Sequence, residues 1–222
     1  RIPEENHPNK LFFAYANTVA TIDFAKKYKG HGWMGIRYHI SPEEPYNEIM
    51  IHVRFHQTEA RLQQEAIGIM GVNLVYGAFY NYDEPKKIIK HLYDHIDRSA
   101  IEIDTINFSG PVFKGVDNRI MSLLLLKNKM TEAVMFNPQG NNVLPARVLY
   151  KKNILVLRGS FRPVTKVNID MFKKSYDIFI KENNVNEHKT EVIFEITLSN
   201  LTAQGEIDES DFMDRAKLLC SL

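Results

Sequence analysis

The segment N-I-L-V-L-R-G-S-F-R-P-V-T-K-V-N-I-D-M-F, residues 153–172, decides the fold that we predict for this chain. Its four apolar residues at 154–157 are typical of a short strand buried on both faces. A turn at residues 158–160 then interrupts the apolar run. Apolar residues recur at helical spacing from Val164, which predicts a helix to about Lys181. Strand, glycine-containing turn and helix are typical of the place where an α/β sheet binds a ligand.

Strands and helices alternate in the sequence after Ser99, and such alternation indicates right-handed crossovers and a mostly parallel sheet. We therefore predict an α/β fold, in which residues 99–222 form a Rossmann-like part. The other elements predicted here are strands at 101–108, 132–136 and 191–198, and helices at about 118–127, 144–150 and after Asp208.

Residues 1–98 show a different pattern, which predicts an α+β part with a hairpin and long helices. The hairpin joins two alternating segments, 33–40 and 48–55, through a turn at 41–47. Residues 1–9 are polar, which predicts an extended lead-in. The helices are predicted at 10–28, from an N-cap at Thr58 to about Tyr80, and from residue 83 to about Ile96 with Pro85 in the first turn.

Composition limits the possible partners and compartments. The 222 residues are 44% hydrophobic and 25% charged, as in an ordinary soluble globular protein. A formal net charge of +1 argues against a nucleic acid partner. A single cysteine, Cys220, excludes an internal disulfide framework and favours a reducing compartment, so we predict the cytoplasm. No apolar run approaches the roughly 20 residues that cross a bilayer, so we predict no membrane partner.

The turn and helix start at residues 159–168 resemble the first signature of the cytidylyltransferase-like nucleotidyltransferases. That family includes the enzymes that adenylate nicotinic acid mononucleotide and pantetheine phosphate. Three positions depart from the signature: Val167 replaces a Gly, Asn168 replaces the His, and Arg162 stands where an acidic residue is common. The positions that match are Gly159, Ser160, Phe161, Pro163 and Thr165.

The resemblance implies a phosphate site at this turn. The amides of Gly159 and Ser160, together with Arg162, would hold the phosphate, and Thr165 and Asn168 would orient it as the catalytic residues. Mg²⁺ is the counter-charge that phosphoryl transfer implies. The alternative for this segment is a buried strand followed by an ordinary solvent-facing turn.

A second pair of candidate ligand-binding residues, Asp117 and Asn118, follows a Gly-Pro loop at the end of a predicted strand. An Asp-Asn-Arg sequence there could bind or orient a phosphate ligand. The alternative is that Asp117 or Asn118 caps the following helix, which is what these residue types commonly do.

Over its whole length the chain resembles a family of uncharacterised bacterial proteins, which carry labels such as nicotinate-nucleotide adenylyltransferase and TonB-dependent receptor. The members are longer than this chain. We therefore expect it to be truncated at its C-terminal end, where a helical pattern is still running. The stretches that carry the resemblance are residues 13–19, 31–37, 63–68, 71–74 and 158–163.

Histidines gather near the predicted hairpin, and two interpretations stay open for them. His52 and Arg54 share strand parity and His56 continues it, while His39 lies nearby. These imidazoles could bind a metal, but no carboxylate pair or Cys completes a site, so a polar outer face is the favoured interpretation.

Two further predictions concern single features. A loop containing His31 and Trp33 could line a ligand or simply pack the indole. Glu195, inside a predicted buried strand, needs a partner such as Arg158 or Arg162.

Two functions follow from the sequence. The first is a nucleotide- or phosphate-binding protein related to nucleotidyltransferases, with adenylyl transfer to a nicotinate mononucleotide-like substrate as the implied reaction. The second is a non-catalytic binding or assembly module. In that case Gly68, Gly71 and Gly77 would bring a helix close to another helix, either within the chain or in a homodimer.

Overall fold

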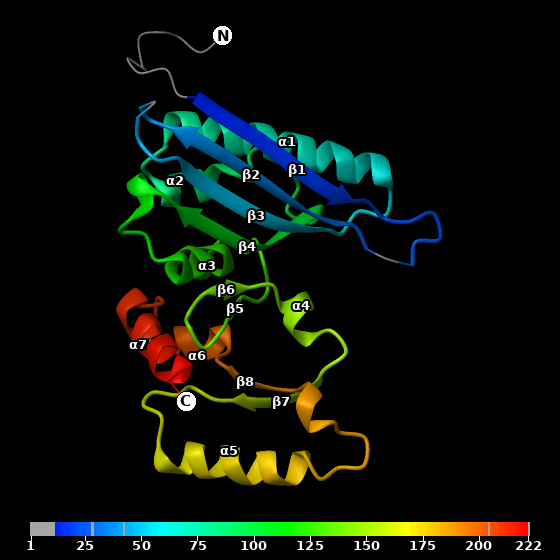
Figure 1. Cartoon of the computed structure of the whole chain (residues 1–222), viewed down its shortest axis with the longest axis vertical. Helices are drawn as coiled ribbons and strands as arrows, with labels where there is room; N and C mark the ends of the chain where they lie inside the picture. Colours follow the sequence, from blue (N-terminus) through cyan, green and yellow to red (C-terminus); the bar gives the residue numbers. More distant parts are fainter. Residues whose placement is uncertain (1–11, 28, 42, 204, 222) are drawn as a thin grey trace. The chain divides into compact units, whose positions relative to one another are not determined.

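The computed structural model describes residues 12–27, 29–41, 43–203 and 205–221 (Figure 1). The chain divides into two units, Arg1–Val134 and Met135–Leu222, and each is described by itself. The change of pattern near Ser99 therefore lies inside the first unit. The extended lead-in predicted for residues 1–9 lies outside the described residues.

A four-stranded antiparallel sheet is the basis of the first unit. The predicted hairpin is confirmed as its second and third strands, which pair from His31 opposite Arg54 to Tyr38 opposite Asn47. In order along the sheet, the strands are β1 (Phe12–Ala20), β2 (His31–His39), β3 (Asn47–Phe55) and β4 (Ile101–Ser109).

Three helices bury one face of this sheet: α1 (Ala60–Tyr80), α2 (Pro85–His91) and α3 (Asn118–Lys127). Figure 1 shows α1 behind the strands. Alternation along β3 directs its apolar side chains to the helices, where they join one hydrophobic core. A short 3₁₀ turn, η2 (Pro111–Phe113), links β4 to α3. Buried residues of this core include Ile36, Ile49, Ile51, Val53, Met70, Leu74, Ile89, Ile103 and Leu125.

The second unit contains a β-α-β unit in which β7 (Asn153–Arg158) and β8 (Thr190–Glu195) pair in parallel. Helix α5 (Lys166–Phe179) lies between them in sequence and makes the crossover, as the segment at 153–172 predicts. The remaining elements are an antiparallel pair, β5 (Met135–Phe136) with β6 (Asn142–Val143), the helices α4 (Pro145–Leu149), α6 (Leu198–Thr202) and α7 (Glu209–Cys220), and the 3₁₀ turn η3 (Glu187–Lys189).

The prediction of a mostly parallel sheet is wrong. Among the described residues, the parallel pairing is limited to β7 and β8, and the largest sheet is antiparallel. Strand β4 follows two helices, as a crossover strand would, but it pairs antiparallel with β3. Alternation of helices and strands does not specify which edge a strand joins or in which direction, and here the free edge of β3 is where β4 pairs.

The predicted helix at 10–28 is also wrong, since residues 12–20 form strand β1 along β2. Large side chains at Phe13, Tyr15 and Val19 are compatible with both a helical and a strand period. The segment forms a strand instead of a helix, because its backbone hydrogen-bonds to β2 while Tyr15 and Val19 pack against the core. The ends of the predicted segment, Lys10 and Tyr28, lie outside the described residues.

Several element boundaries differ from their predictions. Glu59, rather than Thr58, is the N-cap of α1, and its side chain makes no capping hydrogen bond. Helix α2 ends at His91 instead of near Ile96, and β5 is only two residues long. The strand predicted at 154–157 is confirmed, but it is not buried on both faces, because Val156 is 47% exposed.

Candidate functional site

The predicted phosphate turn folds around one aromatic side chain, Phe161. It is buried, adopts a left-handed backbone conformation with φ of 47°, and packs its ring edge against Phe194 at a centroid distance of 5.8 Å. The backbone of Gly159 extends the parallel ladder by donating to the Glu195 carbonyl at 3.1 Å. The turn is therefore anchored at the carboxyl end of β7, where parallel sheets commonly bind ligands.

Two arginines flank this turn and share one carboxylate. Arg215 of α7 is only 4% exposed; its Nη1 donates to the Ser160 carbonyl at 3.1 Å, and its Nη2 pairs with Asp211. The Nε of Arg162 lies 2.9 Å from Oδ1 of the same Asp211. Within the described part of the chain, the Nε of Arg215 has no hydrogen-bond partner. The pKa of Asp208, the N-cap of α7, lies below its ordinary value because its carboxylate accepts hydrogen bonds from the amides of Ser210 and Asp211 and because the charge of Arg162 also acts on it.

Thr165 and Asn168 form a capping box at the start of α5. Oδ1 of Asn168 accepts from the amide and the hydroxyl of Thr165, each at 2.8 Å, and Thr165 Oγ1 accepts from the Asn168 amide at 3.4 Å. Both side chains thus satisfy amides that a helix start leaves without partners. Their catalytic roles stay predictions.

The expected partner of Glu195 is confirmed as Arg158. The two residues face each other in register at the ends of β8 and β7. Nε and Nη2 of Arg158 donate to the two carboxylate oxygens at 3.0 and 3.1 Å, which is a bidentate pair.

Asp117 and Asn118 belong to the first unit, whereas the turn belongs to the second. Asp117 is the N-cap of α3, and its Oδ1 accepts from the amide of Arg119 at 2.9 Å. Asn118 accepts from the Phe108 amide at 2.8 Å and donates to the Phe108 carbonyl at 3.0 Å. The geometry agrees with the alternative of a helix cap; ligand binding by these residues stays a prediction.

A second polar cluster lies in the first unit, on the sheet face opposite the helices. His52, 2% exposed, has its Nδ1 2.7 Å from Oδ1 of Asp104, and its Nε2 lies 3.3 Å from Nδ1 of His31. A β-bulge creates this arrangement: His52 opposes Thr105 while Val53 opposes Ile103, so Asp104 is the extra residue. Bulges commonly redirect side chains near functional sites.

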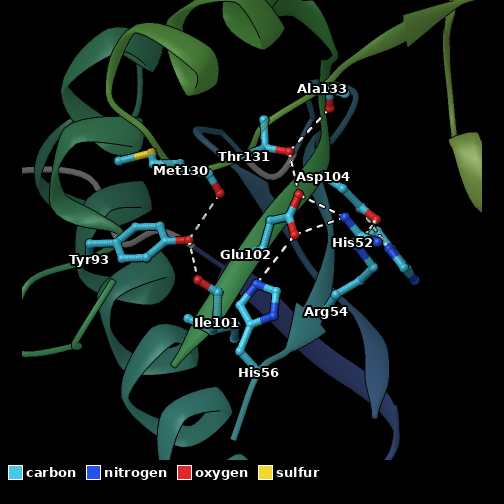
Figure 2. Close-up of polar contacts among 10 residues, drawn as sticks. All are labelled: His52, Arg54, His56, Tyr93, Ile101, Glu102, Asp104, Met130, Thr131 and Ala133. Carbon is cyan, nitrogen blue, oxygen red and sulfur yellow. Dashed lines mark hydrogen bonds and ion pairs between the residues drawn. The ribbon is translucent and has the colours of Figure 1, made fainter. Parts of the chain in front are cut away.

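Glu102 is the centre of the neighbouring contacts, as Figure 2 shows. Its carboxylate accepts from Arg54 Nη2 at 2.8 Å and from Thr131 Oγ1 at 2.7 Å, and lies 3.3 Å from Nε2 of His56. Burial raises the pKa of Glu102, but the hydrogen bonds from Thr131 and Arg54 and the charge of Arg54 outweigh it, so the pKa lies below its ordinary value. Arg54 also reaches Asp104, with Nε 3.4 Å from Oδ2.

Tyr93 follows α2 and links its segment to the start of β4 by hydrogen bonds (Figure 2). Its hydroxyl donates to the carbonyls of Ile101 at 2.7 Å and Met130 at 3.3 Å. Burial, followed by the charge of Glu102, raises the pKa of Tyr93. The phenol therefore stays neutral and serves as a hydrogen-bond donor.

The histidine predictions need correction. His52 lies on the polar face opposite the helices but is buried there, and His31 and Trp33 lie on strand β2 rather than in a loop. No group of three or more His, Cys, Asp or Glu side chains could hold a metal ion within the described ranges.

Sequence reasoning missed five residues that complete the two clusters: Glu102, Asp104, Thr131, Asp211 and Arg215. The carboxylates of Glu102 and Asp104 alternate with Ile101 and Ile103, and this alternation is a signal that could have indicated a polar face. Arg215 gave no comparable signal, since its contact with Ser160 joins distant parts of the sequence. Thr131 gave none either.

Comparisons with known proteins found no match: no family model, no curated protein and no solved structure is similar to this chain. Among the helices described, none combines the length and apolar character that crossing a membrane requires.

Proposed function

We propose that the second unit binds the phosphate group of a small nucleotide at the turn formed by residues 159–165. The observation that carries the proposal is Arg215, a buried guanidinium that holds the Ser160 carbonyl while its Nε has no hydrogen-bond partner among the described residues. Arginine is the side chain that best matches phosphate oxygens, because it presents several N–H donors in one plane.

The surrounding geometry supports this assignment. Arg162 and Arg215 both pair with Asp211, so a bound phosphate could replace that carboxylate as the partner of one or both guanidinium groups. The turn follows a parallel strand and precedes a helix, where backbone amides and the helix dipole favour an anion. Adenylyl transfer to a nicotinate mononucleotide-like substrate is the reaction that the resemblance adds to this proposal.

Magnesium would have to arrive with the nucleotide. Asp211 is engaged by two arginines, and no set of carboxylates suited to a metal occurs among the described residues. Mg²⁺ commonly binds through substrate phosphates with one or two protein carboxylates, so the turn by itself does not provide its site.

The test is a thermal-shift titration with ATP, CTP, nicotinic acid mononucleotide and NAD, each with and without Mg²⁺. A ligand that binds only the folded protein adds about 2.7 kcal/mol of stability at 100 times its Kd. We expect a shift that is lost in Arg162→Ala and in Arg215→Gln. Lys174→Ala is the matched control, since Lys174 is an exposed cation of α5 paired with Asp170. A shift that survives both arginine substitutions, or no shift with any ligand, contradicts the proposal.

A second candidate function is assembly of two copies through α1. The outer side of this helix exposes Val72 by 68% and Tyr76 by 52%, and a Cβ at Gly68 would meet nothing within 4 Å. Gly71 and Gly77, by contrast, pack inside the unit against Tyr15 and Ile88. A homodimer would therefore use the outer stripe. Sedimentation should show a dimer that Tyr76→Glu dissociates, and a monomer at every concentration contradicts it.

A nucleotide-binding role fits the cytoplasm, where nucleotides are abundant and a free Cys220 stays reduced. We include that compartment in the proposal.

A further inference from the structure

Three side chains of the first unit form a chain from a buried carboxylate to an exposed imidazole: Asp104, His52 and His31. We propose that they are a proton relay, and that His31 uses it for general acid–base chemistry on a small ligand with a weakly acidic O–H or N–H group. This site is independent of the phosphate turn.

The contacts assign the protons. Ionised Asp104 can only accept, so Nδ1 of His52 must donate to it across 2.7 Å. When His52 is neutral, its Nε2 carries a lone pair, and Nδ1 of His31, 3.3 Å away, donates to it. Nε2 of His31 is left as a bare acceptor at the exposed end of the chain.

Proton transfer through this chain balances without any other reactant. The ligand gives its proton to Nε2 of His31, and the Nδ1 proton of His31 moves to Nε2 of His52. His31 ends neutral, the positive charge rests on His52 beside Asp104, and the ligand keeps the negative charge. The return of both protons completes the cycle. In this scheme His31 touches the ligand, while His52 and Asp104 are positioning residues.

The surroundings of His31 suit a small ligand. The indole of Trp33 lies beside His52, with ring centroids 4.8 Å apart, and is partly exposed for stacking. The strand residues opposite His31 and Trp33 are the small, exposed Ala20 and Thr18 of β1.

A second observation points to the same face. Thr105 is buried opposite His52, and its hydroxyl has no hydrogen-bond partner in the described part of the chain. Ile106 faces the core, so Thr105 is directed to the face of the relay. A buried hydroxyl of this kind is a group that a ligand or its hydrogen-bond network would satisfy.

Three further titratable or charged groups face the relay. Arg54 pairs with Oδ2 of Asp104, which leaves Oδ1 for His52. Glu102, on β4, contacts both Arg54 and His56. Any pH profile of His31 therefore has to be compared with profiles of these neighbours.

The first test needs no substitution. Long-range ¹H–¹⁵N NMR at pH 8, above the usual imidazole pKa of about 6.5, reports which ring nitrogen carries each proton. We expect protonated Nδ1 and bare Nε2 in both His52 and His31. A proton on Nε2 of either ring overturns the relay, because the chain would then point the wrong way.

The second test uses diethyl pyrocarbonate, whose carbonyl carbon is attacked by a bare imidazole nitrogen. When Nε2 of His31 is acylated, ethyl carbonate leaves, and the Nδ1 proton passes to His52. Modification of each histidine is followed by mass spectrometry. We expect Asp104→Asn to slow acylation of His31 roughly tenfold, by analogy with the lower end of the effect that carboxylates behind metal-bound imidazoles have.

The matched control is Asp94→Asn. Asp94 binds Nδ1 of the exposed His91 at 2.8 Å, so this change should affect His91 and leave the rate at His31 unchanged. An unchanged rate at His31 in folded Asp104→Asn overturns the proposal, since a purely structural carboxylate would not alter this reactivity. If that variant does not fold, the NMR result on the unaltered protein decides.

Discussion

The four-stranded antiparallel sheet and the two-stranded parallel pair of this protein bury their side chains very differently. In the four-stranded antiparallel sheet, three helices cover one face, and Ile49, Ile51 and Val53 on β3 are wholly buried. In the two-stranded parallel pair, every residue of β7 and β8 is at least partly exposed. The apolar run at 154–157 thus specifies a strand without specifying its burial, because burial depends on how many elements cover the sheet.

The largest effect that tests this difference comes from deleting a core side chain. Ile51→Ala should lower the free energy of unfolding by about 2–5 kcal/mol, because it leaves a cavity among residues that cannot fully collapse. Val156→Ala, in the parallel pair, should lower it by less than about 1 kcal/mol, since this side chain is already half in water.

Urea unfolding measures both variants, with Trp33, the only tryptophan of the chain, as a probe of the first unit. Hydrogen exchange of β7 reports on the second unit. Equal losses in the two variants would remove the contrast between the sheets.

The next effect concerns how tightly α1 lies on the edge strand β1. A Cβ at Gly71 would collide with the hydroxyl of Tyr15, so Gly71→Leu should destabilise the fold by about 1–3 kcal/mol. Gly68→Ala on the open side of the same helix should instead stabilise it by roughly 0.5–1 kcal/mol, as helix propensity predicts. Thermal unfolding of the pair checks the signs, and destabilisation by Gly68→Ala would contradict this packing.

The two units can also be compared through one carboxylate in each, the buried Glu102 and the more exposed Glu191. The folded-state pKa of Glu102 lies below its ordinary value of 4.5, so its stabilisation is present above that value and is lost as the pH falls through the folded pKa. At pH 7, Glu102→Gln should remove about 1–3 kcal/mol, because Arg54 and Thr131 lose a charged partner. It should also make the free energy of unfolding depend less on pH in the acid range.

Glu191→Gln is the comparison in the second unit, where Glu191 pairs with Lys152 on the surface. We expect less than about 1 kcal/mol there, as for most exposed ion pairs. Urea unfolding from pH 3 to pH 7 measures both variants. A pH dependence in the acid range that Glu102→Gln leaves unchanged would show that other carboxylates are responsible for it.

The smallest effect separates capping from ligand binding at α5. Thr165→Ala should lower the free energy of unfolding by about 0.5–2 kcal/mol and speed hydrogen exchange in the first turn of this helix. Thr165→Ser keeps the hydroxyl and should restore both. If Thr165→Ala changes neither stability nor exchange but abolishes a nucleotide-induced thermal shift, the capping role is secondary.

Much of the local structure could be predicted from the sequence. The hairpin, the helices α1 and α3 and the strand–turn–helix at 153–172 follow from periodicity and turn residues, which act over a few positions. The cap at Asp117 was one of two stated alternatives for that residue. The helix predicted at 10–28 failed, because its large residues fit two periods and pairing with β2 decided between them.

The candidate sites were less predictable. The parity of His52 and Arg54 is visible in the sequence, but their carboxylate partners Glu102 and Asp104 come from β4, about fifty residues away, through a bulge. Arg215 reaches Ser160 across a similar separation. Contacts of this kind depend on strand pairing and helix placement, which no local pattern encodes.

The sequence by itself determined where the chain forms turns, caps and most of its regular elements, because those depend on neighbours within about one helical turn. Only the tertiary structure decided that the main sheet is antiparallel, that His52 is buried against Asp104, and that Arg215 lies under the turn at Ser160. The physical reason is that a sheet edge, a bulge and a buried ion pair are satisfied by residues distant in sequence, so their partners exist only once the chain has folded.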